Sequence, residues 1–84
     1  MTPAITNPQL APLDMLIQEH AAGVFRYLRS VVREEDASRD LLHDTFLKLS
    51  PHARDAGRAL VYTVARSCAL DHLRRRRTRQ KHET

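Results

Sequence analysis

The chain has 84 residues and a formal net charge of +4 at neutral pH. This length allows one domain near the lower limit for a self-sufficient core, and a hydrophobic content of 42% excludes a wholly disordered protein. With only two glycines, and with three of the four prolines in the first twelve positions, long stretches lack helix breakers. We therefore expect helices rather than strands.

The sequence lacks the features of secreted, membrane and metal-binding proteins. No apolar run approaches the ~18 residues of a membrane span, and the N-terminus has no charged and apolar segments of a secretory signal. Cys68 is the single cysteine, and we expect it to be a buried thiol in a reducing compartment. The five histidines show no ligand spacing, so we expect neither a metal nor a cofactor. The expected location is the cytoplasm.

The first predicted helix follows a flexible lead-in at residues 1–9. It begins at Leu10 or Leu13 and ends at Val32, because its apolar residues recur at spacings of three and four. These residues are Leu13, Leu16, Ile17, His20 or Ala21, Val24, Tyr27 or Leu28, and Val31. Gly23 in the middle costs about 1 kcal/mol relative to alanine, and the missing side chain leaves room for a close helix crossing.

The second predicted helix follows a turn at residues 33–35. Asp36 is the expected N-cap, because its carboxylate can accept hydrogen bonds from the amides of the first turn. The helix should end near Leu49, since Pro51 disfavours helix in the residue before it. Its buried stripe is Leu41, Leu42, Thr45, Phe46 and Leu49. Its other face carries Asp40, His43, Asp44 and Leu47 at the same three-four spacing.

The third predicted helix follows the connection at residues 51–57. Asp55 is its expected cap, and the helix should run from Ala56 to Arg77. Its apolar stripe is Leu60 or Val61, Val64 or Ala65, Cys68, and Leu70, His72 or Leu73. The three helices together predict an all-α, three-helix bundle with a basic C-terminal helix extension.

That extension is the strongest indication of function in the sequence. Six of the fourteen lysines and arginines lie within the last eleven positions. A cationic extension on a buried helix favours a polyanionic partner, above all nucleic acid. The alternative is a solvated, disordered tail.

Three segments, taken in order, resemble region 2 of the sigma factors of bacterial RNA polymerase, in the sigma-70 family and its extracytoplasmic-function (ECF) group. Residues 24–29 (VFRYLR) are similar to that group's "lyrYlrr" stretch, and residues 36–49 (DASRDLLHDTFLKL) to its "DAEDLvQETFlrL" helix. Residues 58–75 are similar to "RAwLyrIARNlalDhlRR". The resemblance covers about residues 13–79. It implies a region 2 domain at residues 10–79, followed by the start of a linker at residues 80–84.

The resemblance implies that the second helix docks on the clamp helices of the largest subunit of core RNA polymerase. The implied contacts are the outward residues Asp40, His43, Asp44 and Leu47. A mostly acidic face with an apolar extension suits a basic helical partner. The alternative interpretation is an ordinary charged helix exterior.

The third helix and the loop before it are implied to bind the −10 element of promoter DNA, whose non-template strand is opened. Arg58, Tyr62 and Arg66 recur every four residues, so two guanidinium groups flank an aromatic ring on one helix face. Arginines can contact phosphates, and a ring can stack on an unpaired base. Arg74 and Arg75 are further expected DNA contacts. In the alternative, Tyr62 is only half-buried packing and Arg66 pairs with Asp71 or another carboxylate.

The sequence shows no nucleophile–base pair, no paired catalytic carboxylates and no phosphate loop, so we expect no enzymatic activity. Region 4, the second domain of such sigma factors, is not among these residues, and we expect an excised domain. Two other functions stay open. A lone region 2 would act as a transcription regulator or as bait for an anti-sigma factor, and a generic basic helical module would bind duplex DNA without binding polymerase.

Overall fold

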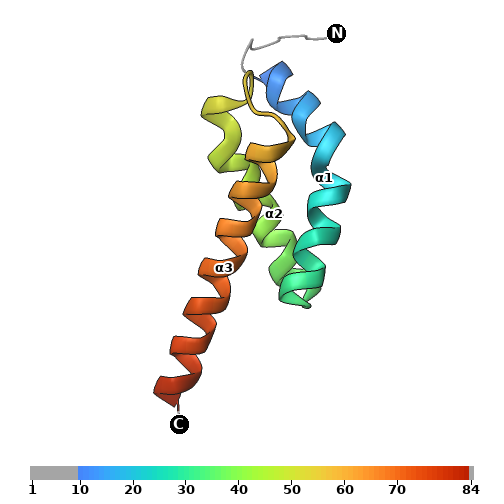
Figure 1. Ribbon diagram of the computed structural model, residues 1–84. Coiled ribbons are helices and arrows are strands. Elements are labelled where there is room, and N and C mark those ends of the chain that lie inside the picture. The colour runs from blue at the N-terminus through green and yellow to red at the C-terminus, as the bar shows by residue number, and fades with distance from the viewer. Residues whose placement is uncertain (1–9, 84) are drawn as a thin grey trace, which may run out of the picture.

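The computed structural model describes residues 10–83, which fold into three α-helices and one short 3₁₀ helix (Figure 1). Helix α1 spans Leu10–Val32, α2 spans Glu35–Leu49, η1 spans Ser50–His52 and α3 spans Arg58–Glu83. The described part of the chain contains no strand, so the predicted all-α, three-helix bundle is confirmed. The lead-in expected at residues 1–9 lies outside the described residues.

The core lies where the three helices face one another, and it consists largely of the predicted stripes. Val24, Leu28, Leu49, Val61 and Ala65 are fully buried. The rest of the core cluster is Leu16, Val32, Leu41, Phe46, Cys68 and Ala69. The predicted burial of the Cys68 thiol is confirmed, with 3% of the residue exposed. Leu42, predicted in the buried stripe, is only partly buried against this core.

The turn between α1 and α2 differs from the predicted one at its cap. Arg33 ends α1 in the left-handed conformation, with φ 71°, and its N–H donates to the carbonyl of Arg29. Helix α2 then begins at Glu35, with Glu34 in extended conformation as the N-cap and no capping side-chain hydrogen bond. The prediction of Asp36 as the cap is therefore wrong. Asp36 lies in the first turn, where its negative charge interacts favourably with the positive end of the helix dipole.

The predicted end of α2 at Leu49 is confirmed, but the connection that follows has structure of its own. Ser50–His52 form η1, and the amides of Asp55 and Ala56 then donate to the carbonyl of His52. This turn places Asp55 ahead of the helix, so its predicted role as the cap of α3 is wrong. Helix α3 begins at Arg58, and the amide of Val61 donates to the carbonyl of Gly57.

Helix α3 also continues beyond the predicted end at Arg77. It runs to Glu83, because arginine, glutamine and lysine are good helix formers and no glycine or proline interrupts them. Figure 1 shows its last turns projecting past the turn between α1 and α2. The predicted basic helix extension is confirmed. It includes residues 80–83, where a linker was expected to begin.

Candidate functional site

The four residues predicted on the outward side of α2 lie together on an exposed surface, here called the α2 face: Asp40, His43, Asp44 and Leu47. Leu47 is 69% exposed, so it adds apolar area to this surface. The other helices do not cover this face, because the opposite side of α2 supplies Leu41, Thr45 and Leu49 to the core. The α2 face is therefore accessible to a partner.

Two grooves flank the α2 face and give its sides different chemistry. Asp40 and Asp44 line a groove between α2 and α3, which we call the acidic groove. Its carboxylates are those of Glu34, Glu35, Asp36, Asp40, Asp44 and Asp71, and its cations are Lys48 and Arg75. His43 and Leu47 line a second, apolar groove between α1 and α2. The apolar groove is completed by Leu13, Ile17, Ala21, Leu42 and Phe46.

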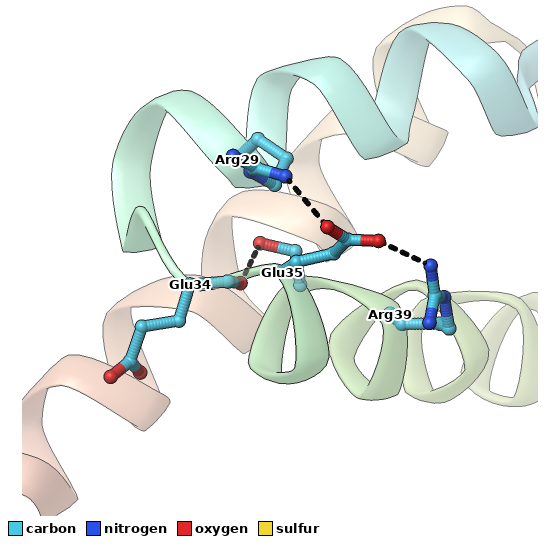
Figure 2. A network of polar contacts seen from close by, with 5 residues as sticks. Arg29, Glu34, Glu35 and Arg39 are labelled. Atoms are coloured by element: carbon cyan, nitrogen blue, oxygen red, sulfur yellow. Dashed lines mark hydrogen bonds and ion pairs between the residues drawn. The ribbon is translucent and has the colours of Figure 1, made fainter.

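Ion pairs at the α1–α2 turn tie the three helices together near the acidic groove. Figure 2 shows the Glu35 carboxylate between Arg29 of α1, at 3.5 Å, and Arg39 of α2, at 2.6 Å. The backbone carbonyl of Glu34 accepts a hydrogen bond from the hydroxyl of the buried Ser38, at 2.7 Å. The side chain of Glu34 lies 3.1 Å from Arg76 of α3. The turn thus contacts α3 at the point where that helix leaves the bundle.

The structure also brings together Arg58, Tyr62 and Arg66, here called the α3 face. The guanidinium of Arg58 lies over the Tyr62 ring, with Cζ 5.7 Å from the ring centroid. Tyr62 is half-buried and meets Tyr27 edge-on, with 5.9 Å between centroids and an interplanar angle of 77°. Arg66 is exposed, and no ion pair among the described side chains involves it. Asp71, its expected alternative partner, pairs with Arg74 instead.

Tyr62 is fixed in place by packing at both its edge and its hydroxyl. The hydroxyl lies against Gly23, in the space that a Cβ atom at that position would occupy. The room expected at Gly23 is therefore used, but by a side chain of α3 and not by a close crossing of the helices. A ring held in this way offers a stacking surface that loses little conformational entropy when a base binds.

We expect Gly23→Ala to destabilise the domain, although alanine favours helix by about 1 kcal/mol. The added methyl group would displace the Tyr62 hydroxyl, and such overpacking typically costs about 1–3 kcal/mol. Tyr62→Phe removes the oxygen and leaves ring atom Cζ in ordinary contact, 3.8 Å from the methyl position. In that background Gly23→Ala should be stabilising. Thermal melts of the wild type, the two single variants and the double variant test this. An equal loss of stability from Gly23→Ala with Tyr62 and with phenylalanine at that position would contradict it.

The arginines at the end of α3 differ in their surroundings. Arg74 lies 3.4 Å from Asp71 of the same helix, and Arg76 pairs with Glu34. Arg75 is exposed but lines the acidic groove beside Asp40 and Asp44. Sequence reasoning missed these carboxylate partners. The structure therefore places the two predicted DNA contacts of this segment, Arg74 and Arg75, close to negative charge.

The described residues contain no group of three side chains that could hold a metal ion. None of the helices in the described part of the chain combines the length and apolar character that crossing a bilayer requires.

Comparison with protein families decides which family this arrangement belongs to. The family model described as Sigma-70 region 2 matches residues 16–79, which is more than half of the chain. The chain belongs to the Sigma-70 region 2 family. This family consists of transcription-initiation domains and is not a family of enzymes. Comparisons with curated proteins and with solved structures gave no match.

Within this sigma region 2 domain, the match spans both predicted surfaces, the α2 face and the α3 face. The structure adds a small pocket beside the α3 face that sequence reasoning missed. Glu19, His20 and Gly23 of α1 line this pocket together with Gly57, Arg58 and Tyr62. Little in the sequence indicated these α1 residues, because a polar residue on a helix is most often simply exposed to solvent.

Proposed function

We propose that this domain acts in transcription initiation by docking on core RNA polymerase and helping to open the −10 element of a promoter. In this proposal it is a region 2 domain of the extracytoplasmic-function group, and it works in the cytoplasm beside the polymerase. The α2 face binds the clamp helices of the largest subunit, and the α3 face holds the opened non-template strand. The observation that carries the proposal is the family match across both surfaces.

The chemistry of the α2 face supports a basic helical partner. Asp40 and Asp44 stand on the edge of a groove lined by six carboxylates. Three of the six pair with arginines, whereas Asp40 and Asp44 form no ion pair among the described side chains, so the groove edge carries uncompensated negative charge. Such an excess of negative charge steers a basic helix toward the surface and fixes its register. Leu47 and the apolar groove on the other side offer area that a partner can desolvate. Charge and apolar contact together suit docking better than either alone.

The α3 face supports binding to a single strand. Arg58 and Arg66 are exposed cations one helical turn away from Tyr62 on either side, and the ring lies between them. Cations follow the phosphate backbone, and the aromatic ring accepts an unpaired base. The adjacent pocket offers room beside the ring. Trapping unpaired bases in this way shifts the duplex equilibrium toward the open form, so melting needs binding energy alone.

The test is a titration of the 84-residue chain with fluorescent non-template-strand oligonucleotides and matched duplex, with and without core polymerase. We expect the domain to bind core polymerase and then to prefer the opened strand. Without polymerase, binding near physiological salt should be micromolar or weaker, within the non-specific range.

The other hypotheses give different results in the same titration. Core binding with no preference for the opened strand would favour a transcription regulator that occupies the clamp or serves as bait for an anti-sigma factor. Salt-sensitive duplex binding with no affinity for polymerase would favour a generic basic module.

A further inference from the structure

The arginines at the end of α3 are not equally available to DNA, although their sequence suggests one continuous basic patch. Arg76 is half-buried, and its guanidinium lies 3.1 Å from the carboxylate of Glu34, whereas Arg74, Arg75 and Arg77 are exposed. Arg74 forms an ion pair with Asp71. A phosphate that approached Arg76 would have to compete with the Glu34 carboxylate, which already lies within ion-pair distance of it.

The acidic groove also disfavours phosphate on the side of α3 that carries Arg75. The carboxylates of Asp40, Asp44 and Asp71 line this groove with Arg75. At physiological ionic strength the screening length is about 8 Å, so carboxylates that line the same groove act on a phosphate that approaches Arg75. Negative charge on the protein therefore lowers the attraction that Arg75 would exert on a phosphate.

Arg77 points to a different side of the helix. Successive residues of an α-helix are about 100° apart, so Arg77 lies about 200° around the helix from Arg75. The same geometry brings Arg77 to within about 20° of Arg66, roughly 16 Å further along the axis. Both side chains are exposed. No ion pair between described side chains involves Arg77, whereas Arg74 and Arg76 are paired.

We propose that Arg77 continues the α3 face and contacts a phosphate of the bound DNA strand, whereas Arg76 is held by Glu34 and serves to orient the helix. The inference rests on the proposed function, because it extends the same DNA-binding face beyond Arg66. Arg77 becomes the outer end of a row of contacts that winds about 100° around α3 from Arg58. The acidic groove on the other side of α3 stays free for a basic partner of α2.

Adjacent arginines provide a matched test, since Arg77→Ala and Arg76→Ala remove the same charge one residue apart. Affinity for the non-template strand is measured over a range of salt concentrations, with the chain bound to core polymerase. Arg77→Ala should lower affinity roughly fivefold at 0.1 M salt and reduce the salt slope by about 0.7, as loss of one single-strand phosphate contact does. Arg76→Ala should leave the slope unchanged and lower the melting temperature slightly.

A third variant tests the role of Glu34 directly. Glu34→Gln releases Arg76 from its carboxylate, so it should raise affinity for the strand and steepen the salt dependence. Equal losses from Arg76→Ala and Arg77→Ala would show a diffuse basic tail and overturn the inference, as would an unchanged slope in Arg77→Ala. Either result would leave the proposed function standing if the wild-type chain still prefers the opened strand. A wild-type chain that showed no such preference would overturn both.

Discussion

Replacing both Asp40 and Asp44 by arginine is expected to lower the affinity of this domain for core RNA polymerase at least tenfold, or about 1.4 kcal/mol. Both carboxylates are exposed on α2 and line the acidic groove. The change puts positive charge where a basic clamp helix is proposed to dock. Like charges facing each other across an interface cost up to several kcal/mol, so the tenfold loss is a lower bound. Titration of core polymerase with labelled domain measures the effect.

The double variant should still fold, because exposed charges contribute little to stability. Its melting temperature and helical circular dichroism should stay close to those of the wild type. A matched control is Asp14→Arg with Asp55→Arg, which makes the same change in net charge at exposed positions outside both grooves. Unchanged polymerase binding by the α2 variant, or an equal loss in the control, would contradict docking through the α2 face.

The bundle could be predicted because burial depends mainly on periodicity within each helix. Val24, Leu28, Val61 and Ala65 recur at helical spacing and lie in the core as expected. Spacing also placed the α2 face on the outside, since the residues opposite Leu41 and Leu49 must face solvent. The structure did not alter these assignments. They required no knowledge of which helices are neighbours.

The helix starts could not be predicted in the same way, because a cap depends on the conformation of the residues before it. Asp36 is a suitable capping residue by type. The left-handed conformation of Arg33 ends α1 so tightly that α2 begins at Glu35, one residue before Asp36. In the same way, residues 50–56 form η1 and the turn after it, so Asp55 lies outside α3. Rare backbone conformations of non-glycine residues leave little trace in sequence.

Charge pairing between distant segments was likewise beyond sequence reasoning. Arg74–Arg77 read as one uniform basic run, whereas the fold provides Glu34 for Arg76 and places Arg75 at a groove that carboxylates also line. These partners come from the α1–α2 turn and from α2, and only the packing angle of α3 decides which arginine meets them. The same holds for Tyr62, whose position depends on Gly23 and Tyr27 in α1. The geometry of the α3 face therefore rests on tertiary contacts.

Replacing Tyr62 by alanine is expected to reduce the preference of the polymerase-bound domain for the opened strand, with less effect on its affinity for duplex. The ring is held by Tyr27 and Gly23, and Arg58 lies 5.7 Å from its centroid. A base that stacks on an aromatic side chain gains about 1–3 kcal/mol, so the preference should fall roughly tenfold. Titrations of the single strand and of matched duplex, each with core polymerase present, give the ratio.

Two controls separate stacking from packing and from charge. Tyr62→Phe keeps the ring and should keep the preference for the opened strand. Tyr62→Ala also loses the contact with Tyr27, so its binding is measured at a temperature below its melting transition. Arg66→Ala should weaken binding to single strand and duplex alike and flatten the salt dependence, as loss of a phosphate contact does. If Tyr62→Ala and Arg66→Ala gave the same pattern, Tyr62 would be a packing residue. A retained preference in Tyr62→Ala would likewise show that bases do not stack on this ring, because no other part of the side chain can distinguish an unpaired base from a paired one.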